Sequence, residues 1–154
     1  MLSRGLRVGL LSVVLLGVGA AAAVMPSFAT EQVAAVQQSH RLVIQVNKKD
    51  AELQEHVLSN IVNLQKHYGM DEIEIEVVAY GPGVWFLTDQ SEFKARIESL
   101  LLQNVVFTAC GNTLDTIETR DAKRPALIDG VEVAQAGIAR LMERQEQGWS
   151  YLSP

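Results

Sequence analysis

The chain has 154 residues, a formal net charge of −5, and 48% hydrophobic and 20% charged residues. This length and composition favour one domain that can bury a sizeable core without metal or disulfide cross-links. An acidic chain without a basic stretch is a poor candidate for binding nucleic acid. A single cysteine also excludes a disulfide within the chain.

Residues 1–29 have the features of a secretory signal peptide. Arg4 and Arg7 form a short basic region, residues 8–25 carry no charge, and residues 27–29 (Ser-Phe-Ala) fit a signal-peptidase site before Thr30. The alternative is an uncleaved membrane anchor, because the uncharged run is long enough to span a bilayer. We therefore expect an exported, periplasmic protein, or a membrane-anchored one if the leader is retained. Cleavage would lower the net charge from −5 to −7.

Hydrophobic periodicity predicts alternating strands and helices after a linker at residues 30–40. The predicted strands are residues 41–46, 73–80, 105–109, 131–134 and 149–152. The predicted helices are residues 50–68, 114–119 and 135–147, and one that starts between residues 89 and 92 and has its buried face at residues 93–101. This order is typical of a three-layer α/β domain, residues 41–154, with a mainly parallel sheet and helices on both of its faces. A strand order of 2-1-3-4-5 would place the first strand between the second and the third.

Two patterns lead to expectations about burial. Glu74 and Glu76 alternate with apolar residues, which indicates a strand with one solvated face near a sheet edge rather than a pair of functional carboxylates. In the last helix, the spacing of Ile138, Leu141 and Met142 predicts that all three face the core.

Cys110, the only cysteine, is the residue most indicative of chemistry. It follows an apolar strand and precedes Gly111, and Asn112 or Thr113 is suited to cap a following helix. A thiol at this junction faces unpaired N–H groups and the positive end of a helix dipole, and both favour the nucleophilic thiolate. The alternative is a buried, unreactive cysteine that packs as a small hydrophobic residue.

The other candidate site residues belong to the same predicted edge of the sheet. The loop 81–87 follows the second strand, and residues 110–113 follow the third, so we expect both loops to share one crevice. Its predicted lining is Asn47, Gly81, Gly83, Gly111, Asn112 and Thr113. Trp85 and Phe86 are interpreted as core or subunit contacts, with a ligand platform as the alternative.

Several kinds of site lack support in the sequence. His40, His56 and His67 do not have the spacing of metal ligands, and Gly81 and Gly83 match no phosphate-binding pattern, so we expect neither a metal nor a cofactor. No histidine is placed to serve Cys110 as a base, which disfavours a protease-like or acyl-transfer enzyme. Whether the protein is an enzyme stays open at this point.

Four blocks of the sequence together resemble the DsrE/DsrF-like family of sulfur-relay proteins. They are Tyr-Gly-Pro-Gly-Val at 80–84, Phe-Thr-Ala-Cys-Gly-Asn-Thr-Leu at 107–114, Gly-Val-Glu-Val at 130–133 and Gln-Glu-Gln-Gly-Trp-Ser-Tyr at 145–151. The resemblance covers roughly residues 40–154 and, with the leader, points to an exported branch. It implies a flavodoxin-like domain that forms homo-oligomers or assembles with related subunits, often as trimers or hexamers. It also implies that Cys110 carries sulfane sulfur as a persulfide.

The favoured hypothesis is an exported persulfide carrier or sulfurtransferase-like protein that exchanges sulfur with a donor and an acceptor protein and needs no cofactor. A second hypothesis is a non-catalytic small-ligand-binding or oligomeric accessory module in which Cys110 only packs. A third is a thiol redox sensor, in which Cys110 forms a sulfenic acid or an intermolecular disulfide. The accessibility of the thiol separates the second hypothesis from the other two.

Overall fold

The structure, a computed structural model, describes residues 40–154; the predictions for the leader and for the linker up to residue 39 lie outside this range. His40, assigned to the linker from the sequence, is the first residue of a strand. The elements in chain order are β1 (His40–Val46), α1 (Ala51–Tyr68), β2 (Ile73–Ala79), the 3₁₀ helix η1 (Gly81–Leu87), α2 (Lys94–Leu101), β3 (Val105–Cys110), α3 (Gly111–Asp121), β4 (Glu132–Ala134), α4 (Gly137–Glu146) and β5 (Ser150–Leu152).

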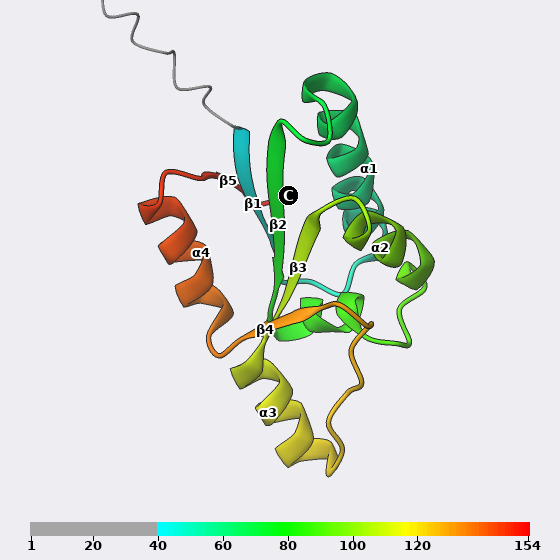
Figure 1. Cartoon of the computed structure of the whole chain (residues 1–154). Helices are drawn as coiled ribbons and strands as arrows, with labels where there is room; N and C mark the ends of the chain where they lie inside the picture. Colours follow the sequence, from blue (N-terminus) through cyan, green and yellow to red (C-terminus); the bar gives the residue numbers. More distant parts are fainter. Residues whose placement is uncertain (1–39) are drawn as a thin grey trace, which may run out of the picture. The chain divides into compact units, whose positions relative to one another are not determined.

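The strands form one five-stranded sheet in the order β4-β3-β2-β1-β5, and each pairing between these strands is parallel. Helices α1 and α2 cover one face and α4 covers the other (Figure 1). The predicted three-layer α/β fold is therefore confirmed. The strand order 2-1-3-4-5 is wrong, because β2 lies between β1 and β3. From β1 to β4 each new strand is added on the same side of the sheet, and β5 then pairs with the other side of β1.

The face under α1 and α2 is apolar. The Asp50 carboxylate caps α1 by accepting a hydrogen bond from the backbone N–H of Leu53 at 3.0 Å, and α1 ends at Gly69, which has a φ of +99°. The helix then buries Val57 and Ile61 against the sheet. The strands contribute fully buried side chains to this core: Ile44, Val46, Val77, Ala79, Phe107 and Ala109.

The face under α4 differs, because it contains a fully buried carboxylate. Glu76 accepts hydrogen bonds from the Thr108 hydroxyl at 2.7 Å and from the guanidinium groups of Arg140 and Arg144. Burial by itself would raise the pKa of Glu76, but these hydrogen bonds outweigh it and hold the pKa below its ordinary value. The prediction that β2 lies near a sheet edge is thus wrong, because β2 is the central strand. Of the two carboxylates expected to be solvated, Glu74 is exposed and Glu76 is buried. Polar residues that alternate with apolar ones in a strand can face either solvent or a polar partner. The partners of Glu76 are Arg140 and Arg144, which lie 64 and 68 residues later in the chain.

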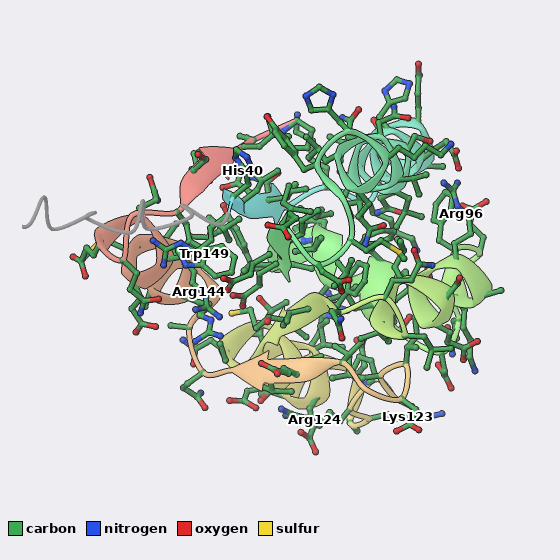
Figure 2. All side chains as sticks on the ribbon, turned by 45° about the horizontal axis from the view of Figure 1, so that its top comes forward. His40, Arg96, Lys123, Arg124, Arg144 and Trp149 are labelled. Carbon is green, nitrogen blue, oxygen red and sulfur yellow. The ribbon has the colours of Figure 1, made fainter. Side chains whose placement is uncertain are left out.

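Helix α4 packs through one stripe, Gly137, Leu141 and Arg144, with Leu141 in a small apolar cluster beside Val43, Val78 and Trp149. The Arg144 guanidinium lies 4.3 Å from the centre of the Trp149 ring, and Figure 2 shows the two side chains together. The prediction that Ile138 and Met142 face the core is wrong, since they are 64% and 62% exposed. They lie outside the packed face, where Leu141 contacts the apolar cluster and Arg140 and Arg144 bind Glu76.

Candidate functional site

Cys110 is the last residue of β3 and the N-cap of α3. Helix α3 begins at Gly111, so Asn112 and Thr113 lie in its first turn, and the prediction that one of them caps the helix is wrong. The reason is that no linker separates the strand from the helix. The side chain of Cys110 is buried, with 6% of the residue exposed.

The sulfur of Cys110 is surrounded by hydrogen-bond donors from two helices. Burial would raise the pKa of the thiol, but four donors outweigh it and hold the pKa below its ordinary value: the Thr113 hydroxyl and the backbone N–H groups of Gly137, Thr113 and Asn112. The Gly137 N–H lies 3.2 Å from Sγ. Because Gly137 is the first residue of α4, the positive ends of two helices converge on one sulfur.

The contribution of α4 was not foreseen from the sequence, although Gly137 is a signal that could have indicated it. A Cβ atom at Gly137 would lie 3.1 Å from Cβ of Cys110 and 3.3 Å from Cβ of Tyr80. Only glycine lets the start of α4 approach the ends of β2 and β3 this closely. The close approach is what brings the Gly137 N–H to the sulfur.

The loop after β2 meets the first turn of α3, as predicted. Gly81, with a φ of +52°, donates its N–H to the Thr113 hydroxyl oxygen at 3.0 Å. Gly83 is structural instead: a Cβ atom there would lie 2.2 Å from the carbonyl oxygen of Val46. Asn47 approaches the same loop through its backbone. The loop therefore orients Thr113, and Thr113 in turn contacts Cys110.

A cavity of about 540 Å³ lies between η1 and α3. Its lining includes three of the predicted site residues, Gly81, Asn112 and Thr113, but not Asn47, Gly83, Cys110 or Gly111. The residues that line it are Lys49, Gly81, Pro82, Trp85, Asn112, Thr113, Thr116, Ile117 and Arg120. Lys49 lies over the Trp85 ring, with Nζ 5.5 Å from its centre, and Arg120 is paired with Asp121. The thiol is therefore adjacent to the predicted crevice, through Thr113, but is not part of its wall.

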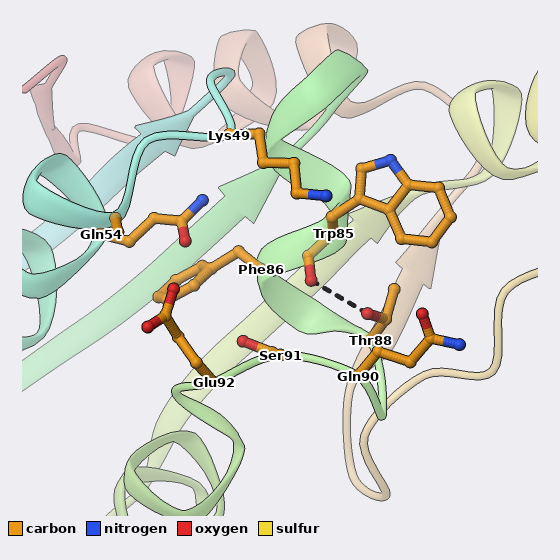
Figure 3. A pocket seen from close by; sticks show the side chains of 9 residues that line it. Lys49, Gln54, Trp85, Phe86, Thr88, Gln90, Ser91 and Glu92 are labelled. Carbon is orange, nitrogen blue, oxygen red and sulfur yellow. Dashed lines mark hydrogen bonds between the residues drawn. The ribbon is translucent and has the colours of Figure 1, made fainter.

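Trp85 also lines a second, smaller cavity of about 290 Å³, which Figure 3 shows from close by. Lys49 and Gln54 line it on one side, and the segment that carries Ser91 and Glu92 lines it on the other. Phe86 is 1% exposed and belongs to the apolar core, as interpreted from the sequence, whereas Trp85 is only partly buried. Trp85 therefore lines both cavities.

Two further properties concern residues 40–154 alone. This part of the chain contains no group of three or more His, Cys, Asp or Glu side chains placed to hold a metal ion. None of its helices combines the length and hydropathy needed to cross a membrane.

Residues 40–154 match the model of the DsrE/DsrF-like family, so the chain belongs to that family. Similar solved structures include the protein of unknown function MTH1491 from Methanobacterium thermoautotrophicum, at 33% identity and a TM-score of 0.67, covering 75% of this chain and 99% of that one. The ychN protein of E. coli has the same fold at 15% identity and a TM-score of 0.59, with coverage of 75% and 99%. So does the conserved protein of unknown function BT1422 from Bacteroides thetaiotaomicron, at 19% identity and a TM-score of 0.55, with coverage of 78% and 99%. No curated protein matches the chain.

Proposed function

We propose that this protein is an exported sulfur carrier that holds sulfane sulfur as a persulfide on Cys110. Membership of the DsrE/DsrF-like family supports a role in sulfur relay. The observation that carries the specific proposal is the environment of the only cysteine, whose sulfur lies where two helices begin and accepts a hydrogen bond from the Gly137 N–H at 3.2 Å. A low thiol pKa at the start of two helices suits a nucleophile more than an inert core residue.

The transfer step needs no cofactor. The Cys110 thiolate attacks the terminal sulfur of a donor persulfide, R–S–SH. A new S–S bond forms to Cys110, the donor S–S bond breaks, and the donor leaves as R–S⁻. The transferred sulfur keeps its proton, and the exchange involves no net oxidation or reduction. The donors from Gly137, Thr113 and Asn112 stabilise the attacking thiolate, and the reverse step hands sulfur to an acceptor thiolate.

Intact mass spectrometry tests this proposal directly. After incubation with a low-molecular-weight persulfide, the protein is expected to gain one sulfur atom, about 32 Da, which a reductant removes. The Cys110→Ser variant, which retains a small polar side chain, should gain none. Absence of the adduct in the native protein, with a thiol that alkylates only after unfolding, would refute the carrier function.

A second candidate is a small-ligand-binding module. It is favoured by the cavity beside Trp85, which Cys110 does not line. A small-molecule library screened by ligand-observed NMR tests this candidate. A ligand that binds the Cys110→Ser variant unchanged but is lost in Lys49→Met would support it, with Lys48→Met as the control because Lys48 does not line the cavity.

The proposal includes export and self-association. In cell fractionation, the mature protein is expected in the periplasm with Thr30 as its first residue, and retention of residues 1–29 in the membrane fraction would indicate an anchor instead. Light scattering coupled to size-exclusion chromatography is expected to give the mass of a trimer or a hexamer. A monomer at micromolar concentration would contradict that part of the proposal.

A further inference from the structure

The segment between β4 and α4 closes over Cys110. The carbonyl oxygen of Gln135 accepts two hydrogen bonds, one from the backbone N–H of Asn112 at 2.9 Å and one from the thiol of Cys110, with Sγ at 3.9 Å. Two residues later, the N–H of Gly137 donates to the same sulfur. The 6% exposure of Cys110 is therefore achieved in part by this segment.

The side chain of Gln135 ties the segment to α3. Its Nε2 donates to Oδ1 of Asn112 at 2.7 Å and to Oδ2 of Asp115 at 3.3 Å. Asp115 is itself paired with Arg124, whose Nη1 lies 2.5 Å from Oδ1. The contact is also close at the backbone, because a Cβ atom at Gly111 would lie 3.2 Å from Cα of Gln135. One exposed glutamine thus joins the entry of α4 to the first turn of α3.

The body of α4 is fixed independently of Gln135. Arg140 and Arg144 bind the buried Glu76, and Leu141 packs beside Trp149. Loss of the Gln135 side chain would therefore leave most of the helix in place. Any movement would be confined to the segment between β4 and α4 and to Gly137 at the start of α4, which are the residues that contact the sulfur.

We propose that Gln135 is a positioning residue that holds the β4–α4 segment over Cys110, where the segment supplies the Gly137 N–H to the sulfur and limits the access of reagents. This inference rests on the proposed function: in a sulfur carrier, Gln135 would limit how readily the Cys110 thiol reacts. It predicts two separable properties of the thiol: its pKa, through the N–H donor, and the reactivity of the thiolate, through steric cover.

Alkylation by iodoacetamide, followed over a range of pH, measures both properties in the same experiment. The midpoint of the pH–rate profile gives the thiol pKa, and the plateau at high pH gives the reactivity of the thiolate. In Gln135→Ala we expect the midpoint to rise by about one pH unit, because one hydrogen bond to the charged sulfur is weakened. We expect the plateau rate to rise about fivefold or more, because the covering segment opens more often.

Charged side chains on the surrounding elements are unchanged in this variant. They are Asp115 on α3, Glu76 on β2, Glu132 on β4 and Arg140 on α4. Asp115 loses one hydrogen bond but keeps its ion pair with Arg124, which holds its pKa low. A change in the midpoint therefore reports the donors at the sulfur rather than a new charge near it.

A second variant and a control complete the experiment. Gln135→Met keeps the length of the side chain without its hydrogen-bond donor or a new charge, and should change both parameters in the same direction as Gln135→Ala. Gln145→Ala is the matched control, because Gln145 lies on α4 and donates only to the carbonyl oxygen of Leu141, at 3.0 Å. It should leave both parameters at the wild-type values.

A rise in both the midpoint and the plateau in the two Gln135 variants would support the proposal. A change in only one parameter, or in neither, would overturn it. This result is independent of the sulfur-carrier proposal, since iodoacetamide requires no sulfur donor: failure of the wild-type protein to accept sulfane sulfur would leave the alkylation profiles unaffected.

Discussion

The two faces of the sheet are built on different principles. The face under α1 and α2 is a continuous apolar core, whereas the face under α4 combines a small apolar cluster with a buried carboxylate and two arginines. The first arrangement stabilises by removing apolar area from water. The second stabilises less per residue, because the burial of charges offsets much of the attraction between them, but it fixes the orientation of one helix.

The reactive thiol of Cys110 lies on the face that α4 covers. Cys110 and Thr108 point to the same face of β3 as the α4 contacts, whereas Phe107 and Ala109 point to the apolar core. The nucleophile therefore lies on the polar face, where a helix held by directional bonds presents its first N–H to the sulfur. Four predictions test this division, in order of decreasing effect.

Phe107→Ala is expected to have the largest effect on stability. Phe107 is fully buried, with its ring centre 6.4 Å from that of Phe86, so the substitution leaves a cavity in the apolar core. We expect a loss of about 3–5 kcal/mol in the free energy of unfolding. Urea denaturation monitored by circular dichroism measures it, and a loss below about 1 kcal/mol would show that this face is not the main core.

Glu76→Gln is expected to cost about 2 kcal/mol at pH 7, because two arginines lose their charged partner while the shape of the side chain is kept. The pKa of Glu76 is lower in the folded protein than its ordinary value of 4.5. Its contribution is therefore complete above that value and is lost as the pH falls through the folded-state pKa. Urea denaturation of both proteins at pH 7 and pH 3 should show the difference shrinking at pH 3.

The control for this prediction is the exposed pair Arg96–Glu55. Arg96→Gln breaks an ion pair that water screens, so the free energy of unfolding should stay within experimental error of the wild-type value. A difference between wild type and Glu76→Gln that is equal at both pH values would contradict the account of Glu76 as an ionised, hydrogen-bonded group.

Thr113→Val should change chemistry more than stability. The hydroxyl of Thr113 stabilises the Cys110 thiolate and accepts the N–H of Gly81. Its removal is expected to raise the thiol pKa by about one unit, measured as the midpoint of the pH dependence of alkylation. Thr116→Val, one turn later on α3, removes a hydroxyl bonded only to the Asn112 carbonyl and should leave the midpoint unchanged.

The smallest effect is expected for Ile138→Ser and Met142→Ser. Both side chains are exposed in the single chain, so each substitution should change the free energy of unfolding of the monomer by about 0.5 kcal/mol or less. Leu141→Ala, on the buried stripe of the same helix, should cost about 2–4 kcal/mol in the same denaturation experiment. Equal losses at the three positions would mean that α4 is buried on both stripes.

The sequence by itself determined the alternating α/β pattern and the position of Cys110. Apolar runs such as residues 105–109 and the stripe of helix 51–68 are local patterns, and local periodicity reports which side of an element is apolar. The proximity of Gly81 to Thr113 was also predictable, because the carboxyl ends of parallel strands meet at one edge of a sheet.

Only the tertiary structure decided which polar residues are buried and what covers the sulfur. Glu76 looked solvated because a single strand gives no information about arginines 64 and 68 residues away. Ile138 and Met142 looked buried because apolar side chains alone were assumed to define the packed face of α4, which Leu141 shares with Arg140 and Arg144. Gln135 and Gly137 reach Cys110 because β4 pairs with β3 so that Ala134 lies opposite Cys110. Contacts of that kind depend on how elements pair and pack rather than on the sequence around any one of them.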